Sequence, residues 1–179
     1  MDPALSLALR VSLGLLLAVA ASHKLRDLPR FRAVVANYEV LPRAASERIA
    51  PLFALVELAL ALTLMMGSET AAAGLVAALL FVAYGIAIHL NIRRGRTGID
   101  CGCMGPASHV PLGDGLVLRN GLLAVASLSL MLAPSARPLG WLDAFTVIAA
   151  TGTMALCWQA SERMLRLAPG LARLRRKAS

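Results

Sequence analysis

The residues of this chain best suited to chemistry are two cysteines separated by one glycine, Cys101 and Cys103, in the stretch IDCGCMG. Two thiols this close could form a redox pair, hold a soft metal, or stay unpaired. Glycines at positions 98, 102 and 105, together with Pro106, indicate a turn rather than a helix. A disulfide across one residue would be strained, and strained, accessible disulfides are the labile or catalytic ones. The spacing therefore favours a redox-active disulfide and leaves the other two interpretations open.

The metal alternative uses the same two thiols. Its candidate ligands are Cys101, Cys103 and His109, and zinc, copper or mercury would suit the thiolates. Zinc prefers four ligands, however, and the chain has no second pair of closely spaced cysteines. We therefore predict no metal and no cofactor beyond the disulfide, and nothing in the sequence decides whether a quinone takes part. The third cysteine, Cys157, lies in an apolar run, where cysteine is usually a small hydrophobe.

Composition indicates a lipid bilayer as the solvent of this protein. The chain has 179 residues, 58% of them apolar and 16% charged, with a mean hydropathy of +0.70. Soluble domains are about 45–50% apolar and about 25% charged, and a core of this size cannot hide the excess. The net charge of +8 does not indicate nucleic acid, because the basic residues lie between apolar runs and are not interleaved with aromatic ones.

Five apolar runs are each close to the ~20 residues that cross a ~30 Å hydrocarbon core. The fourth is the shortest and contains an arginine. The runs cover residues 4–22, 49–66, 70–92, 116–132 and 139–160. We predict an all-α fold, a polytopic transmembrane helix bundle of four to five spans. Residues 1–166 would form one transmembrane domain and residues 167–179 a basic cytoplasmic tail.

One further segment, residues 27–41, has a helical apolar face formed by Leu28, Phe31, Val34, Val35, Tyr38 and Leu41. Asp27 is placed to cap this helix, Pro29 lies in its first turn, and Pro42 ends it. The pattern predicts an interfacial amphipathic helix on the bilayer surface; a loop helix docked on the bundle is the alternative.

Five charged or titratable residues in or beside the apolar runs are predicted to support the cysteines. Glu57 lies in the middle of PLFALVELALALTL, where a carboxylate is costly and marks a function or a buried partner. We expect Glu57 to pair with Arg10 or Arg119, in a functional or a purely structural ion pair. Lys24 and His89 follow the first and third runs at the same predicted membrane face, where a histidine near a dithiol favours the thiolate or passes a proton.

The distribution of lysine and arginine predicts the topology. Basic residues are numerous after the first, third and fifth runs, and the N-terminal tail before the first run has none. The positive-inside rule then places the N-terminus outside and the C-terminus, together with Cys101 and Cys103, on the cytoplasmic side. Trp141 and Trp158 lie roughly 25 Å apart along a helix, the separation of the two interfacial belts.

Three segments in order resemble one known family. SHKLRDLPRFRAVVANYEVLP, the glutamate in PLFALVELALAL, and LNIRRGRTGIDCGCMG followed by LRN are similar to the MauE/DoxX-like membrane proteins, over roughly residues 5–135. Met104 replaces the usual phenylalanine. The resemblance implies a bacterial inner-membrane protein of methylamine utilisation that matures a periplasmic, disulfide-rich client such as the methylamine dehydrogenase β-subunit. It also implies a thioredoxin-like, MauD-like partner and makes Cys101 and Cys103 the redox pair.

Charge and resemblance disagree about the side of the membrane. A periplasmic client requires its thiols outside, whereas the basic residues place this pair inside. Either the pair passes electrons across the membrane from a cytoplasmic thioredoxin, or its loop re-enters the bundle, or the orientation is reversed. A soft-metal carrier and a non-catalytic membrane assembly factor are the alternative functions.

Overall fold

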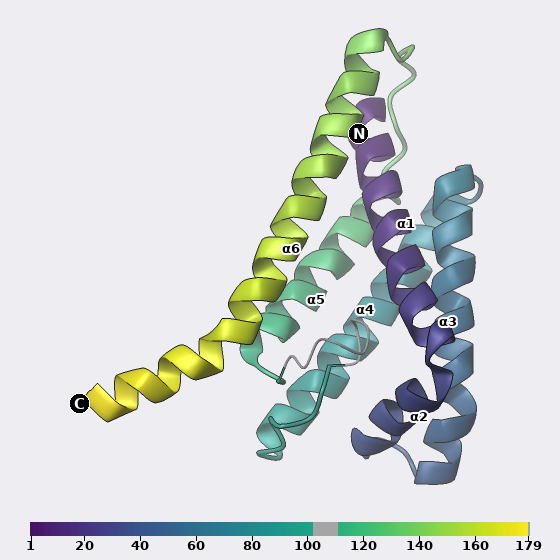
Figure 1. The fold of residues 1–179 in the computed structure, drawn as a ribbon. Coiled ribbons are helices and arrows are strands. Elements are labelled where there is room, and N and C mark those ends of the chain that lie inside the picture. The colour runs from purple at the N-terminus through teal and green to yellow at the C-terminus, as the bar shows by residue number, and fades with distance from the viewer. Residues whose placement is uncertain (102–110, 179) are drawn as a thin grey trace.

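The computed structural model describes residues 1–101 and 111–178, and this part of the chain is helical with no strand. An isolated bridge joins Asp100 to Pro111. The helices are α1 (Pro3–Arg26), α2 (Leu28–Asn37), α3 (Arg43–Met66), α4 (Thr70–Arg93), α5 (Asp114–Ser129) and α6 (Trp141–Ala178) (Figure 1). The predicted all-α bundle is therefore confirmed.

Four helices are long and apolar enough to cross a membrane: α1, α3, α4 and the Trp141–Leu165 part of α6. The helix of the fourth apolar run, α5, has 16 residues and is about 24 Å long. Beyond α5 the chain continues to the end of the bundle where the N-terminus lies, because the amino group of Met1 donates to the carbonyl of Ala133 at 2.9 Å. The expected four to five spans thus correspond to four long helices and one short one.

Close helix contacts depend on small residues. Helix α1 packs along α3 on one side and α6 on the other, and α4 packs along α5 (Figure 1). A Cβ added at Gly14 of α1 would lie 2.9 Å from Met65 Cγ, and one added at Gly74 of α4 would lie 2.7 Å from the carbonyl oxygen of Ser127. Glycine lets these backbones approach, as is usual for helices packed in lipid.

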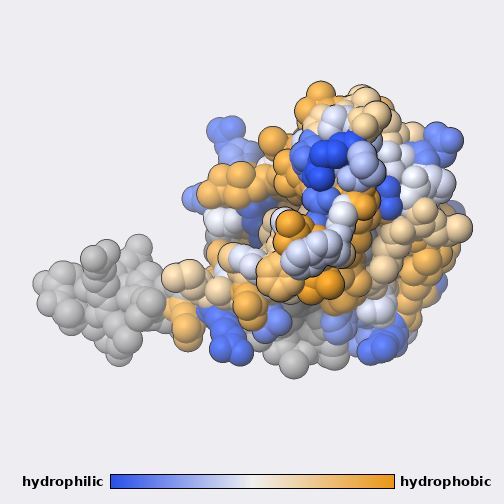
Figure 2. Space-filling model, turned by 90° about the horizontal axis from the view of Figure 1, so that it is seen from above, coloured by the Kyte–Doolittle hydropathy of each residue, from blue (hydrophilic) through white to orange (hydrophobic). Residues whose placement is uncertain are grey.

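The outer surface of the bundle is apolar. Large hydrophobic side chains are exposed on each of the four long helices, and orange apolar side chains cover much of the surface seen in Figure 2. The part of α6 that could span a membrane has almost no buried residues. Such a surface is unfavourable in water and favourable in a bilayer, so the helices are transmembrane helices.

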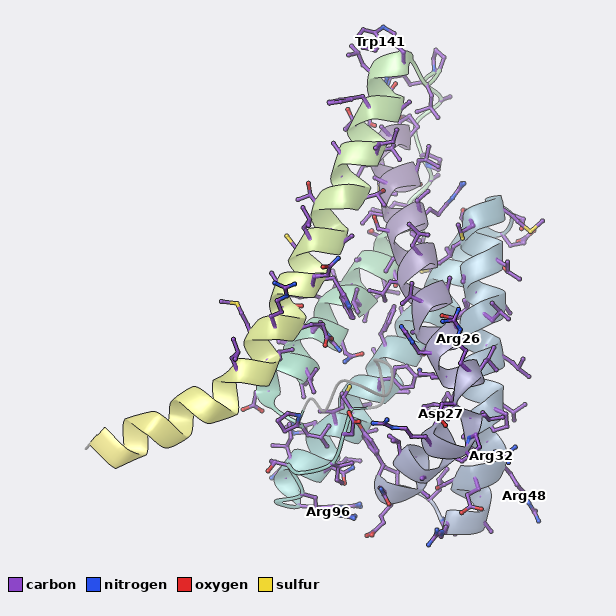
Figure 3. The ribbon with its side chains drawn as sticks, in the orientation of Figure 1. Arg26, Asp27, Arg32, Arg48, Arg96 and Trp141 are labelled. Carbon is purple, nitrogen blue, oxygen red and sulfur yellow. The ribbon has the colours of Figure 1, made fainter. Side chains whose placement is uncertain are left out.

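The labelled charged residues gather at one end of the bundle. Arg26, Arg32, Arg48 and Arg96 lie towards the end that carries α2, and Trp141 lies at the opposite end (Figure 3). The charge pattern of the sequence predicts such a gathering of basic residues at one membrane face. Which end faces the cytoplasm stays a prediction.

Helix α2 is docked on this basic end of the bundle. The side chain of Asp27 accepts a hydrogen bond from the backbone N–H of Arg30 at 3.3 Å, which confirms the predicted cap. The helix ends at Asn37, earlier than the predicted end, and a turn follows. Its Phe31 is buried and α2 packs on α3, so the apolar face of this interfacial helix is turned towards the bundle.

Candidate functional site

Three helices meet at a buried polar cluster formed by Lys24 of α1, Glu57 of α3 and Tyr84 of α4. The ammonium of Lys24 forms an ion pair and hydrogen bond with Glu57 Oε1, and it donates to Tyr84 Oη at 3.2 Å. The Tyr84 hydroxyl in turn donates to Glu57 Oε1 at 2.8 Å. Lys24 is 5% and Glu57 1% exposed, so both charges lie inside the protein.

Burial makes this cluster depend on all of its members. Two charges removed from water are tolerated only when they are paired and hydrogen-bonded. The ammonium of Lys24 also lies 5.0 Å from the ring centroid of Phe31 and 4.8 Å from that of Tyr84, where the negative faces of the rings attract it. The cluster therefore fixes the positions of α1, α3 and α4 relative to one another.

The expected pairing of Glu57 with Arg10 or Arg119 is wrong. Arg119 pairs instead with Glu162 of α6. The guanidinium of Arg10 lies against the α3–α4 turn, where a Cβ added at Gly67 would lie 2.6 Å from Nη2. Arg10 lies too far along the bundle to reach Glu57, because α3 runs antiparallel to α1 and places Glu57 beside the last turn of α1, roughly 21 Å along the helix from Arg10.

The second ion pair changes the interpretation of one tryptophan. Trp158 is half-buried, and the guanidinium carbon of Arg119 lies 4.2 Å from its ring centroid. Through this cation–π contact Trp158 stabilises the Arg119–Glu162 ion pair between α5 and α6. Trp141, by contrast, is 80% exposed at the start of α6, as expected of an interfacial residue.

Cys101 lies within the α4–α5 connection, which is anchored to α2. The hydroxyl of Tyr38 donates to the carbonyl of Cys101 at 3.3 Å, and Arg30 forms an ion pair with Asp100 at 3.4 Å. On the other side, Arg96 forms an ion pair with Glu39 at 2.6 Å. Helix α2 and the turn after it therefore hold the backbone around the first cysteine.

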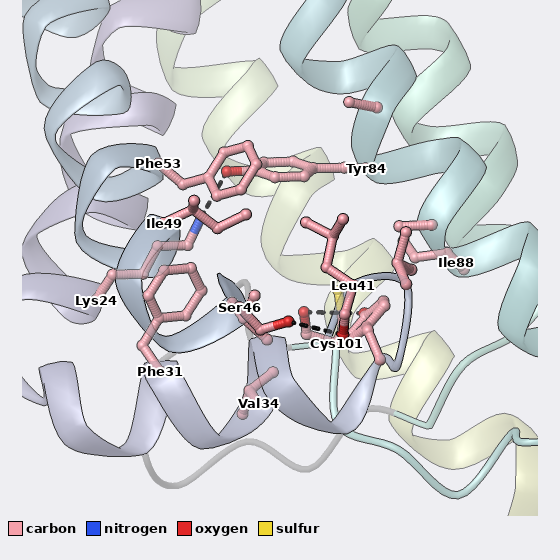
Figure 4. Close-up of a pocket in the computed structure, with 15 residues that line it drawn as sticks. Lys24, Phe31, Val34, Leu41, Ser46, Ile49, Phe53, Tyr84, Ile88 and Cys101 are labelled. Atoms are coloured by element: carbon pink, nitrogen blue, oxygen red, sulfur yellow. Dashed lines mark hydrogen bonds between the residues drawn. The ribbon is translucent and has the colours of Figure 1, made fainter. Parts of the chain in front are cut away.

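Cys101 and the polar cluster share one cavity of about 210 Å³ between α2, α3 and α4 (Figure 4). Lys24 and Tyr84 contribute to its wall, and Cys101 contributes from the connection. The remaining lining is almost entirely apolar; it includes Phe31, Val34, Leu41, Ile49, Phe53 and Ile88. The structure thus brings Cys101 to the same cavity as the buried lysine.

The other predicted site residues are not part of this arrangement. Cys103 and His109 lie outside the described residues, so the disulfide and the alternative metal site stay predictions. Within residues 1–101 and 111–178, no group of three or more His, Cys, Asp or Glu side chains is placed to hold a metal. His89 is exposed on α4, and Cys157 is exposed on α6.

Sequence reasoning treated Lys24 as a residue at the end of a span and did not assign Tyr84 to the site. A lysine that ends an apolar run looks the same in sequence whether it reaches the membrane surface or turns inward. A tyrosine within an apolar helix is a usable signal, because its hydroxyl needs a partner when buried.

Comparison with known proteins agrees with the resemblance seen in the sequence. The family model described as methylamine utilisation protein MauE matches residues 2–134. The MauE proteins of Paracoccus denitrificans and Methylophilus methylotrophus are each 36% identical to this chain, over 88% and 92% of it and 85% and 87% of their own lengths. That of Methylorubrum extorquens is 38% identical over 89% of the chain and 87% of its own length. No solved structure matches the chain. With a family model matching most of its length and relatives similar almost end to end, this membrane protein belongs to the MauE family.

Proposed function

We propose that this protein is a thiol–disulfide redox factor of the bacterial inner membrane that acts in methylamine utilisation. Its client is a secreted, disulfide-rich protein such as the methylamine dehydrogenase β-subunit, and a thioredoxin-like, MauD-like protein is its redox partner. The observation that carries the proposal is the position of Cys101, two residues before a second cysteine and on the wall of a cavity that also contains Lys24. The names of the relatives supply the link to methylamine.

The proposed reaction is thiol–disulfide exchange. One thiolate of the Cys101–Cys103 pair attacks a partner disulfide, forming a mixed disulfide and releasing one partner thiolate. The second cysteine then attacks the mixed disulfide and releases the other partner thiolate. The pair ends as a disulfide and the partner as a dithiol, so two electrons pass from the pair to the partner; the reverse sequence oxidises the partner.

For orientation we propose that the N-terminus is outside and the C-terminus cytoplasmic. The support is the charge distribution: Arg26, Arg32, Arg48 and Arg96 lie towards the end of the bundle that carries α2 (Figure 3), and Tyr38 just after α2 bonds to the carbonyl of Cys101. The cysteines would then lie at the cytoplasmic end, and they would reach a secreted client either by passing electrons across the membrane or through a connection that re-enters the bundle.

Serine substitutions in the organism that encodes this chain test the proposal. Cys101→Ser and Cys103→Ser should each abolish growth on methylamine and leave the client with altered cysteine oxidation, measured by alkylation and mass spectrometry. Cys157→Ser, at the exposed cysteine of α6, is the matched control and should grow normally. Normal growth of the double Cys101→Ser, Cys103→Ser strain would refute the redox role and leave an assembly role. Stoichiometric zinc or copper in the purified reduced protein would instead favour a soft-metal carrier.

A further inference from the structure

The cavity that holds Cys101 opens at the surface of the bundle, beside helices with exposed apolar side chains. Val40 and Leu41 line it and are 47% and 46% exposed, and Ala83 of α4 is an exposed lining residue as well. Deeper in, Phe31 and Phe53 provide aromatic walls (Figure 4). A polar peptide would lose its hydration here without replacement, so the natural occupant is apolar and comes from the membrane.

The inner end of this cavity carries a hydrogen-bond donor for such an occupant. An ammonium group has three N–H donors, and the described contacts of Lys24 use two of them, to Glu57 and Tyr84. Lys24 is 5% exposed, so bulk solvent does not satisfy the third. An occupant with an oxygen acceptor would complete the hydrogen bonding of this buried lysine.

A second cavity lies behind the same cluster. It has about 290 Å³ between α1, α4, α5 and α6, and Lys24 and Tyr84 line both cavities. Glu57, Arg119 and Thr151 line the second one. Glu57 Oε2, Arg119 Nε and Thr151 Oγ1 are buried and have no hydrogen-bond partner in the described structure. Buried polar atoms of this kind are usually satisfied by water, so the second cavity is a polar space of water size or larger beside the Lys24–Glu57–Tyr84 cluster.

We propose that the Cys101 cavity binds the ring of an isoprenoid quinone, which is the electron acceptor of the cysteine pair. Among membrane-soluble molecules, a quinone combines an apolar body, acceptor oxygens for Lys24 and the capacity to take two electrons. This inference rests on the proposed redox function of Cys101 and Cys103, and it fixes the direction of electron flow from client to cysteines to quinone.

The reaction balances without any further reagent. The two S–H bonds of the reduced pair break and one S–S bond forms, which releases two electrons and two protons. The quinone takes both electrons, and its two carbonyl oxygens each gain a proton to give the quinol. Lys24 donates a hydrogen bond to one carbonyl oxygen and stabilises the negative charge that develops there. The Lys24–Glu57–Tyr84 cluster transfers protons between the cavity and the water behind it.

A cavity-filling variant provides the kinetic test. The full chain, reduced and placed in quinone-free phosphatidylcholine nanodiscs, is mixed with decylubiquinone; quinol is followed by absorbance and protein thiols are counted. We expect one quinol for every two thiols lost. Ala87→Phe fills the cavity wall and should raise the KM for decylubiquinone at least tenfold while leaving the redox potential of the cysteines unchanged. Ile86→Phe adds the same ring to the lipid-facing neighbour and should change KM less than twofold.

A binding measurement separates this inference from the redox function. Decylubiquinone should bind the Cys101→Ser, Cys103→Ser protein saturably, and Ala87→Phe on that background should abolish binding while Ile86→Phe does not. A two-electron cysteine couple without quinone binding or reduction would overturn the quinone site and leave the redox function standing. Saturable, Ala87-dependent binding without any cysteine couple would refute the redox function and the electron transfer, and would leave only the quinone-binding part of the inference.

Discussion

At the scale of single residues, the Lys24–Glu57 pair is the feature on which both stability and chemistry depend. Each charge is tolerable inside the bundle because the other is present, and Tyr84 bonds to both. The pair also lies between the Cys101 cavity and the unpartnered polar atoms of the second cavity. A charge pair that served only packing could be replaced by apolar residues at little cost, whereas one that handles protons could not.

A double-mutant cycle tests whether the two buried charges stabilise each other. Lys24→Met alone and Glu57→Leu alone should each destabilise the protein by about 3–5 kcal/mol, because each leaves a buried charge without its partner. The double variant should be much less destabilised than the sum of the two, measured by unfolding in detergent. If the effects of the two substitutions simply add, the two side chains do not interact in the membrane as they do here.

The two halves of the site differ in how far sequence could predict them. IDCGCMG was identifiable because closely spaced cysteines and glycines have few structural uses. The pairing of Glu57 with Lys24 could not be identified, because hydropathy indicates where a helix begins and ends. It does not indicate which residues of two neighbouring helices lie at the same depth in the membrane. The second apolar run begins at residue 49, whereas α3 begins at Arg43, so the run did not include the first turns of this helix.

At the scale of elements, α2 positions the cysteine connection. Arg30 bonds to Asp100, Tyr38 to the carbonyl of Cys101, and Glu39 after the helix to Arg96. The amphipathic pattern correctly predicted this helix and its cap. It favoured the bilayer surface over docking on the bundle, because lipid and protein both accept an apolar face; the structure shows that α2 packs on α3.

Arg30→Gln should loosen this anchoring without unfolding the bundle. The Arg30–Asp100 ion pair is partly exposed, so its loss should cost about 0–1 kcal/mol of stability. The rate at which N-ethylmaleimide modifies Cys101 in the Cys103→Ser, Cys157→Ser background should rise severalfold. Arg32→Gln, at an exposed position of the same helix, is the control and should leave the rate unchanged. Equal rates in both variants would mean that α2 does not restrain the connection.

At the opposite end, Arg137 links the N-terminus to α6, because it forms ion pairs with both Asp2 and Asp143. The backbone N–H of Ala4 lowers the pKa of Asp2 below 3.8, and the hydrogen bond from Arg137 lowers it further. Hydrogen bonds from Arg137 to Asp143 and Asp2 raise the pKa of that guanidinium.

Acid should therefore weaken the Arg137–Asp2 ion pair. Because the folded pKa of Asp2 is depressed, its contribution is present above about pH 4 and is lost as pH falls through the folded value. Thermal unfolding should show Asp2→Asn less stable than the parent at pH 7, with the gap closing towards pH 3. A gap that is constant across this range would rule out the carboxylate as its source.

At the scale of the whole molecule, an apolar belt of four long helices separates two polar ends that differ in charge. The number and order of the long helices followed from run length, since ~20 apolar residues are needed to cross a bilayer. The fourth apolar run was expected to be the least certain span, and its helix α5 has only 16 residues. It packs along α4, so its apolar side chains contact both the protein and the surroundings.

Sidedness is a prediction for the whole molecule. In the Cys157→Ser background, a membrane-impermeant maleimide should label Cys101 and Cys103 in inverted inner-membrane vesicles and not in intact spheroplasts. A permeant maleimide serves as the control and should label both preparations. Labelling from the periplasmic face alone would reverse the orientation, and labelling from both faces would indicate a connection reached through the bundle.

The most direct test of the account is a redox titration of the purified Cys157→Ser protein against dithiothreitol and glutathione buffers, with thiols counted by alkylation and mass spectrometry. We predict one couple with two electrons transferred, assigned to a Cys101–Cys103 disulfide and lost completely in Cys101→Ser. Two thiols that alkylate independently of each other across the whole range, with no two-electron couple, would contradict the account.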